Sequence, residues 1–383
     1  MSRQYFNFSL LLFTHYAQAG TFVTYVSLFF AARGMSAPQI GVLMSLVQAM
    51  RIVGPNLWGW VADHTQQRVV VLRVTALCGS VAFIGMFFGH TFAWFVVLML
   101  VLNLFTSALT PISEALMLAG MKGDLTSYGR MRMWGSIGFI VAVMIASYGL
   151  EWFGVEAFPW IMFGMLLCVV GASTQLREEP RTEAVVVRVP LAAVLRKPEV
   201  IAFFLSTAMM VAAHTSLYVF YSLYLERLGY SKPVIGAMWS IGVIAEIVFF
   251  YFQASVFRSI SPRSVILFAF AVAVARFAMI GAGGASLAVL VMAQLLHAAT
   301  FAAHHSASIM AMQRWFSGAL QGRGQALFVS IAYGAGGTLG GLFMAACWDR
   351  ISPEAAYYAA AGLSACGGLA ALVSFRWQAA RVS

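Results

Sequence analysis

Long apolar runs separated by short polar segments are the dominant pattern along the 383-residue chain. The run from Phe92 to Leu109, for example, contains no charged residue and shows no alternation of apolar and polar positions. A helix needs roughly 20 apolar residues to cross the hydrocarbon of a bilayer, whereas a barrel strand alternates between the two kinds of residue. The pattern therefore predicts helical membrane spans and excludes a β-barrel.

Breaks at charged, glycine and proline positions predict twelve spans in two sets of six. The spans of the first set are 5–30, 38–62, 69–88, 92–118, 128–150 and 157–176. Those of the second set are 199–225, 233–257, 264–281, 286–313, 324–346 and 354–375. Residues 177–198 concentrate charge and proline between the sets, which is typical of a linker. We expect an all-α membrane protein with twelve transmembrane helices, in which a cytoplasmic linker (177–198) joins an N-terminal half (1–176) to a C-terminal half (199–383).

The two halves share a short sequence repeat. Residues 34–45 and 229–240 are identical at six of twelve aligned positions, with a constant offset of 195. The same offset aligns Arg51 with Glu246, so two charges of opposite sign occupy equivalent places in the middle of a span. Parallel repeats of this kind are typical of transporters, which bind substrate near the middle of the membrane.

Composition and charge support a membrane location. The chain is 61% hydrophobic and 9% charged, with a mean hydropathy of +0.85, whereas a soluble domain has about 25% charged residues. The net charge of +10 is distributed unevenly, because few basic residues lie in the loops opposite the termini: Arg33, Arg227, Lys232 and Arg350. The positive-inside rule then places both termini in the cytoplasm. We expect a monomeric, multi-pass protein of a bacterial inner membrane, with no nucleic-acid partner and no cofactor.

Several charged residues fall inside predicted spans, where an ionisable side chain costs about 3 kcal/mol at the helix centre. Arg51, Glu246 and Arg276 lie well inside their spans, while Glu114 and Arg132 lie about a turn inside the ends of theirs. The similar depth of Glu114 and Arg132 makes them candidate partners. Two simpler interpretations stay open: Arg132 as a residue that extends to the membrane surface, and Glu246 with Arg276 as a structural ion pair.

Histidines and tyrosines also recur inside the spans. Those that share a helix face are His297, His304 and His305 in 286–313, His15 and Tyr25 in 5–30, and His214, Tyr218 and Tyr221 in 199–225. Such residues carry protons, line a ligand site or simply pack. No acidic residue or cysteine follows these histidines at i+3 or i+4, so the spacing does not predict a metal site.

The segment after the second span combines a small residue, an acid and a base, in Gly59, Asp63 and Arg68. It is either a simple charged loop or a latch that closes a gate. The spacing Gly59-x-x-x-Asp63 with Arg68 resembles the loop between the second and third helices of the major facilitator superfamily, although Gln66 and Gln67 replace the usual glycine and base.

A more specific resemblance lies in the fourth and fifth spans. Pro111-Ile-Ser-Glu114-Ala and the run from Gly129 to Gly138 resemble the corresponding helices of lactose permease and its relatives. In that group the matching acid and arginine bind substrate, so the resemblance assigns this role to Glu114 and Arg132.

The second half resembles the proton-coupling part of the same group. The run from Met238 to Glu246, the triplet around Arg276 and Leu296-His297 are similar to its glutamate, arginine and histidine motifs. The overall likeness is greatest to the branch of 3-phenylpropionate transporters, through the motifs Ala212-Ala-His214 and Met50-Arg51 and through His297 with His305. One departure is Thr300, which stands where the permease group has its main proton-carrying acid.

These features together predict a proton-coupled symporter, not an enzyme, that imports a small organic acid such as an aromatic carboxylate. The expected substrate residues are Glu114, Arg132, Arg51, His15, Tyr25, His214, Tyr218 and Tyr221. The expected proton-coupling residues are Glu246, Arg276, His297 and His305, and the expected gate is Gly59, Asp63 and Arg68. Two alternatives stay open, namely a proton-coupled symporter of a sugar or nucleoside and a membrane sensor that binds a ligand without transport.

Overall fold

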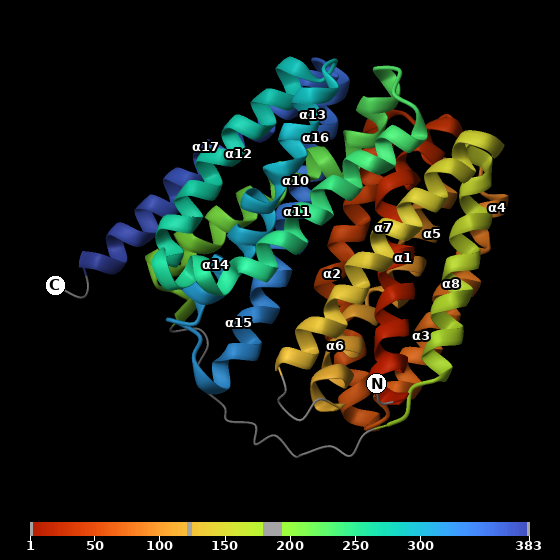
Figure 1. Cartoon of the computed structure of the whole chain (residues 1–383), viewed down its shortest axis with the longest axis horizontal. Helices are drawn as coiled ribbons and strands as arrows, with labels where there is room; N and C mark the ends of the chain where they lie inside the picture. Colours follow the sequence, from red (N-terminus) through yellow and green to blue (C-terminus); the bar gives the residue numbers. More distant parts are fainter. Residues whose placement is uncertain (1–2, 121–124, 179–193, 381–383) are drawn as a thin grey trace. The chain divides into compact units, whose positions relative to one another are not determined.

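The computed structural model describes residues 3–120, 125–178 and 194–380, whose regular structure is entirely helical (Figure 1). These helices form two compact units, residues 1–183 with 225–240 and residues 184–224 with 241–383. The expected linker lies largely outside the described residues. The division of the chain into halves at that linker therefore stays a prediction.

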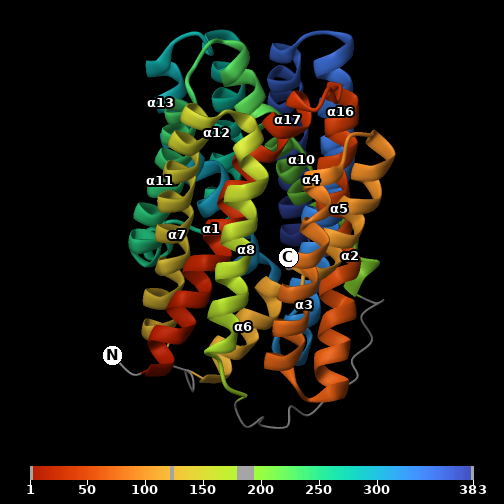
Figure 2. The ribbon, with the colours of Figure 1, turned by 90° about the vertical axis from the view of Figure 1, so that its right-hand side faces the viewer.

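Unit 1 is a bundle in which α1 packs along α7 and α8, while α5 contacts α2 and α3 (Figure 2). Its elements are α1 (Arg3–Ala32), α2 (Ala37–Thr65), α3 (Arg68–Phe83), α4 (Gly85–Phe88), α5 (Phe92–Thr106), α6 (Leu109–Gly120), α7 (Leu125–Phe153), η1 (Val155–Ala157) and α8 (Phe158–Thr174). The α1–α7 contact is very close, because a side-chain carbon on Gly138 would overlap the backbone of Phe13. Only glycine allows this approach.

Unit 2 is built around α12, which packs along α17 and also contacts α13, η2 and α14. The elements of the second half of the chain are α10 (Pro198–Arg227), α11 (Lys232–Ser259), α12 (Pro262–Gly283), α13 (Leu287–Leu295), η2 (Ala298–Ala303), α14 (His304–Met312), η3 (Gly318–Leu320), α15 (Gln321–Phe328), η4 (Val329–Gly336), α16 (Gly337–Arg350) and α17 (Pro353–Ala380). The first part of α11 belongs to unit 1 and the rest to unit 2.

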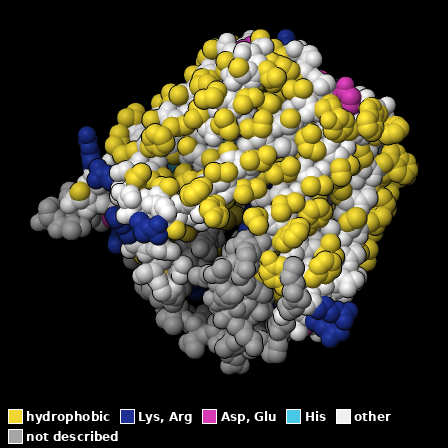
Figure 3. Space-filling model, viewed as in Figure 1, with side chains coloured by type: hydrophobic (Ala, Val, Ile, Leu, Met, Phe, Trp, Pro, Cys, Tyr) yellow, Lys and Arg dark blue, Asp and Glu magenta, His cyan; other side chains and the backbone are white. Residues whose placement is uncertain are grey.

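Eleven helical stretches of the described residues are long and apolar enough to cross a membrane. The twelfth predicted span, 5–30, coincides with α1, which is 30 residues long but buries a polar series that includes Thr14, His15 and Gln18. Large apolar side chains are exposed on these helices, with Trp60 at 63% and Phe268 at 63%, and hydrophobic groups are dense over the upper part of the face drawn in Figure 3. Such exposure is unfavourable in water and suits lipid. The chain is a multi-pass integral membrane protein, as predicted.

Four predicted spans are not the continuous α-helices that the sequence suggested. The span 69–88 breaks between α3 and α4, at Ile84. The span 92–118 breaks between α5 and α6, at Ser107 and Ala108. In the spans 286–313 and 324–346, η2 and η4 are π-helical segments. Because π-segments interrupt regular hydrogen bonding and are frequent at functional sites, η2 and η4 direct attention to unit 2.

Candidate functional site

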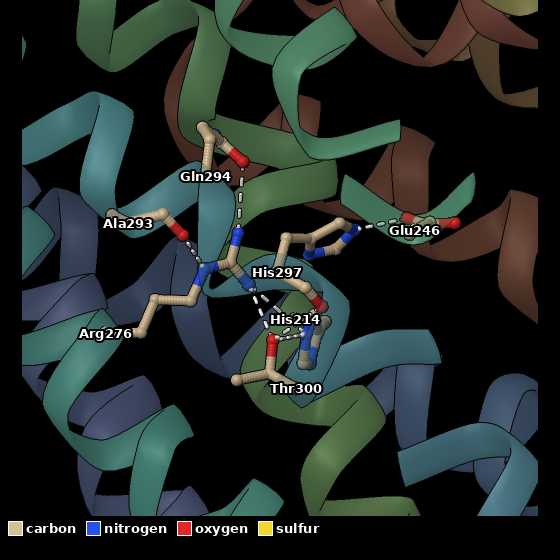
Figure 4. A network of polar contacts seen from close by, with 7 residues as sticks. All are labelled: His214, Glu246, Arg276, Ala293, Gln294, His297 and Thr300. Atoms are coloured by element: carbon tan, nitrogen blue, oxygen red, sulfur yellow. Dashed lines mark hydrogen bonds and ion pairs between the residues drawn. The ribbon is translucent and has the colours of Figure 1, made fainter. Parts of the chain in front are cut away.

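Arg276 of α12 is the centre of a buried polar network in unit 2 (Figure 4). Its side chain is 0% exposed. The guanidinium donates to the backbone oxygen of Ala293 at 2.6 Å, to Oε1 of Gln294 at 3.2 Å and to Oγ1 of Thr300 at 3.0 Å. It also lies 3.5 Å from Nε2 of His214. Four uncharged groups therefore surround a permanently charged side chain.

A second part of the network joins α11 to the start of η2. Oε1 of Glu246 lies 2.8 Å from Nε2 of His297, with 16% and 10% of the two side chains exposed. Among the described residues, Nδ1 of His297 is buried and has no hydrogen-bond partner. The sequence allowed a structural pair between Glu246 and Arg276. Instead, Glu246 pairs with His297, and the hydrogen bonds of Arg276 go to neutral groups.

The π-segment η2 arranges the aromatic side chains along this helix in a row. The ring of His297 stacks on Phe301, with centroids 5.3 Å apart and planes at 9°, and Phe301 stacks on His305 at 6.4 Å and 15°. Nδ1 of His305 lies 3.1 Å from the hydroxyl of Tyr333 in η4. The predicted coupling residues His297 and His305 are therefore connected through an aromatic stack.

A small pocket of unit 2 adjoins this row. It offers about 10 Å³ of space, which is room for about one water molecule. Its walls are Met210, Val211, His214, Tyr218, Thr300, Phe301, His304, His305, Phe328 and Tyr333. Tyr221 is fully buried elsewhere in the unit and does not line the pocket.

Unit 1 brings the other predicted substrate residues around Tyr16. The guanidinium carbon of Arg132 lies 4.1 Å from the centre of the Tyr16 ring, and Tyr16 is also within electrostatic reach of Glu114 and Arg51. Both Arg132 and Glu114 are half-buried, whereas Arg51 is exposed on α2. These three charged residues lie on α7, α6 and α2, and the guanidinium of Arg132 lies over the Tyr16 ring.

Two further candidates in unit 1 have direct partners. Nε2 of His15 lies 2.9 Å from the hydroxyl of Thr110, which ties α1 to α6. The hydroxyl of Tyr25 donates to the backbone oxygen of Val143 at 3.1 Å, and the Tyr25 side chain is fully buried. Tyr25 thus holds α1 against α7 in this conformation.

The predicted gate lies at the α2–α3 turn. Arg68 and Asp63 approach to 3.9 Å, and no heavy atom lies within 4 Å of a side-chain carbon placed on Gly59. The turn is followed by an unpredicted contact, in which the carboxylate of Glu178 accepts hydrogen bonds from the backbone N–H groups of Arg68 at 3.1 Å and Val69 at 2.8 Å. A carboxylate at this position caps the beginning of α3.

A reciprocal contact closes the end of α8. The guanidinium of Arg73, one turn into α3, donates to the backbone oxygens of Ser173 at 3.2 Å, Thr174 at 3.2 Å and Leu176 at 2.7 Å. The start of α3 and the end of α8 therefore cap each other, and the turn that joins the end of α2 to α3 ends at a fixed point.

Sequence reasoning missed Tyr16, Thr110 and Gln294 as members of these networks. Tyr16 follows His15 directly, but it does not lie on the helix face that carries His15 and Tyr25. Gln294 had a visible signal, because it is the only polar residue of the apolar run from Leu287 to Leu296.

Fold and network together define a class of protein. The family model described as the MFS_1 like family matches residues 5–359. The chain belongs to this family, and it is a membrane transporter of the major facilitator type. This result confirms the expected superfamily.

Comparison with individual proteins gives more detail than the family model. The chain is 27% identical over 332 residues, 84% of its length, to the probable 3-phenylpropionic acid transporter of Escherichia coli (strain K12), of which the match covers 85%. It is 29% identical to the maltose permease of Geobacillus stearothermophilus over 147 residues, 38% of this chain and 36% of the permease. The structure of the nucleoside transporter NupG superposes with a TM-score of 0.86 and 17% identity, over 98% of this chain and 99% of the other. The last likeness concerns the fold alone.

Proposed function

We propose that this protein is a proton-coupled symporter that imports a small organic acid across a bacterial inner membrane, with both termini in the cytoplasm. The observation that carries the proposal is the contact of 2.8 Å between Glu246 and His297, in the same unit as the fully buried Arg276. Ionisable groups inside a membrane protein are expensive and usually functional.

The charge of this cluster favours symport of a proton with an anion. With Glu246 ionised and His297 neutral, the Glu246 and Arg276 charges cancel. One added proton on the Glu246–His297 pair leaves the cluster with a net positive charge inside an apolar bundle, which is unfavourable. A carboxylate taken up together with the proton leaves the net charge of the whole protein unchanged, so proton and anion are expected to bind together.

Arg132 is the proposed anchor for the substrate carboxylate. A guanidinium offers a planar pair of N–H groups that matches a carboxylate, and it also stacks on aromatic rings. The ring of Tyr16 already holds one face of Arg132, at 4.1 Å, which restricts the orientation of the group. Glu114, Arg51 and His15 are the proposed neighbours that adjust the fit.

An aromatic acid is the proposed cargo, because a relative that covers 84% of the chain is named as a probable 3-phenylpropionic acid transporter. A sugar is the second candidate. The maltose permease matches part of the chain, and Glu114 together with the His15–Thr110 pair offers hydrogen-bonding groups for hydroxyls.

Uptake into proteoliposomes tests the proposal. Purified protein is reconstituted, and labelled 3-phenylpropionate, maltose and uridine are each offered with and without an imposed pH gradient. We expect accumulation of 3-phenylpropionate only when the outside is acidic. Binding without uptake of any of the three would favour a sensor. Gradient-driven uptake of maltose or uridine alone would identify that compound, instead of the aromatic acid, as the cargo.

The coupling role is tested in the same vesicles with Glu246→Gln, which resembles the protonated carboxyl. Exchange of labelled for unlabelled substrate needs no net proton release, so it should continue, while uphill accumulation should disappear. Glu156→Gln is the matched control, since Glu156 pairs with Arg33 outside the predicted spans. Uphill accumulation by Glu246→Gln would remove Glu246 from the proton-carrying role, and loss in His297→Gln alone would transfer the role to His297.

A further inference from the structure

The buried histidine His214 of α10 has hydrogen-bond contacts at both ring nitrogens. Nδ1 lies 2.8 Å from the backbone oxygen of Met210, while Nε2 lies 3.2 Å from Oγ1 of Thr300 and 3.5 Å from the guanidinium of Arg276. A carbonyl oxygen can only accept a hydrogen bond, so the ring proton is on Nδ1. Arginine can only donate, so Nε2 is the accepting nitrogen of a neutral imidazole.

Thr300 fits the same assignment. Its hydroxyl oxygen accepts from Arg276 at 3.0 Å, and its own proton can point to Nε2 of His214 or to the backbone oxygen of His297 at 3.3 Å. The lone pair of His214 is therefore one of the groups that hold Arg276 in place. Through Arg276, this lone pair ties α10 to α12 and to the segment from Ala293 to Thr300.

The charged and titratable groups that face His214 come from every element packed around it. Arg276 faces it from α12, and the His297 ring at the start of η2 lies 5.7 Å from it, centre to centre. Tyr218 of α10 lies at 6.3 Å, and His304 of α14 is within electrostatic reach. Glu246 is linked through His297. The group in direct contact with Nε2 that bears a permanent charge is Arg276.

We propose that His214 accepts a proton at Nε2 during the transport cycle, and that the imidazolium formed in this way releases Arg276 from its contact with Thr300 of η2. The proton comes from water and uses the lone pair that now accepts from Thr300 and Arg276. The N–H at Nδ1 keeps its bond to Met210, so the ring stays anchored while its other edge changes from acceptor to donor. Two cations then face each other, and Arg276 has to move away.

The pocket offers a place for the water that delivers this proton. His214, Thr300 and His304 line it together, and Nε2 of His304 is buried without a hydrogen-bond partner among the described residues. One water in the pocket could bond both to His304 and to the Thr300–His214 edge. Because the proposal names a residue that couples proton binding to movement within unit 2, it rests on the proposed function.

Nitrogen NMR of the full chain with ¹⁵N-labelled histidine tests the proton site without any substrate. The resonances of His214 are assigned by their loss in His214→Gln. We expect the Nδ1–H tautomer at about pH 8 and the imidazolium only once the sample is made acidic, because the Arg276 cation faces Nε2 and opposes a second positive charge. A resonance with the proton on Nε2 at high pH, or a ring that stays neutral throughout, would overturn the proposal.

Transport then tests the coupling. In His214→Gln an amide oxygen can accept permanently from Thr300 and Arg276, but it cannot take up a proton. In proteoliposomes with 3-phenylpropionate, the ratio of uphill accumulation to exchange should fall at least about tenfold in His214→Gln, and its dependence on pH should flatten. His90→Gln, in an exposed turn, is the control.

The outcomes separate the two hypotheses. Accumulation by His214→Gln with the pH profile of the wild type would refute the role of His214. A wild-type protein that does not accumulate 3-phenylpropionate, yet shows the His214 imidazolium by NMR, would overturn the proposed cargo and leave the proton site standing.

Discussion

Arg132 of α7 rests on the ring of Tyr16 of α1, with its guanidinium carbon 4.1 Å from the ring centre. The helices that carry them are also tightly packed, because Gly138 meets the backbone of Phe13. When the flat face of a guanidinium stacks on an aromatic ring, its N–H groups point outward in the guanidinium plane, where they remain available to a carboxylate.

We expect Arg132→Lys to lose most substrate affinity, at least about tenfold in Kd, which corresponds to about 1.4 kcal/mol. The ammonium keeps the charge but provides neither the planar pair of donors nor the stacking surface. Substrate-induced thermal shift with 3-phenylpropionate measures the affinity, because a ligand that binds the folded state raises its stability. Arg33→Lys is the control, since Arg33 pairs with Glu156. Unchanged affinity in Arg132→Lys would make Arg132 a residue that only extends to the membrane surface.

The second prediction concerns the gate. Asp63→Asn should slow exchange several-fold while leaving equilibrium binding almost intact, because a latch biases the conformational step and not the site. Its effect on stability should stay within about 0.5 kcal/mol, since the approach of 3.9 Å to Arg68 at the surface is a weak interaction. The exchange rate in proteoliposomes and the substrate affinity from thermal shift measure the two effects separately. Lost binding in a folded variant would place Asp63 outside the gating role.

The third prediction concerns Thr300, whose hydroxyl connects Arg276 to His214. Thr300→Val has nearly the same shape but leaves a guanidinium N–H without an acceptor, which should destabilise the protein by about 1–3 kcal/mol. Thr300→Ser should restore most of this stability. The control is Thr207→Val, since the buried Thr207 hydroxyl donates within its own helix, to the backbone oxygen of Phe204. Equal losses from both valine variants in thermal unfolding would argue against the bridge.

The fourth prediction concerns the α1–α7 contact. Gly138→Ala should destabilise the protein by about 1–3 kcal/mol, because the methyl group would overlap the Phe13 backbone and separate the helices. Gly164→Ala on α8 meets no heavy atom within 4 Å, so it should be neutral or slightly stabilising through helix propensity. Thermal unfolding of the two variants in one detergent provides the comparison. If both alanines behaved alike, the tight contact would not be what stabilises this pair.

The helices could be located from the sequence because hydrophobic length is a local property. Apolar runs and their polar breaks predicted the spans, and the motifs around Glu114 and Arg276 predicted the superfamily that the family model confirms. The same reasoning placed His214 among substrate residues, although in the structure its closest contacts are with Met210, Thr300 and Arg276. Motif resemblance identifies a residue, but it does not say which side of the helix meets which neighbour.

Other features were out of reach because they depend on three-dimensional contacts. Nothing in the run from Ala298 to Ala303 distinguishes a π-turn from an α-turn, since its four alanines, Thr300 and Phe301 fit either. The Tyr16–Arg132 stack joins residues that are far apart in the chain, and its geometry depends on the α1–α7 crossing. The carboxylate of Glu178 could be seen in the sequence as a charge, but not as the cap of α3.

The two π-segments also have a mechanical consequence. A π-helical turn holds about one residue more than an α-helical turn. Successive residues of an α-helix are rotated by about 100°. If η2 tightened by one residue into α-geometry, everything beyond it would turn by that angle and advance by about 1.5 Å. His305 would then lose its stacking contact with Phe301. The same change in η4 would turn the Tyr333 hydroxyl away from His305. A small slip in one turn would redirect a whole helix face.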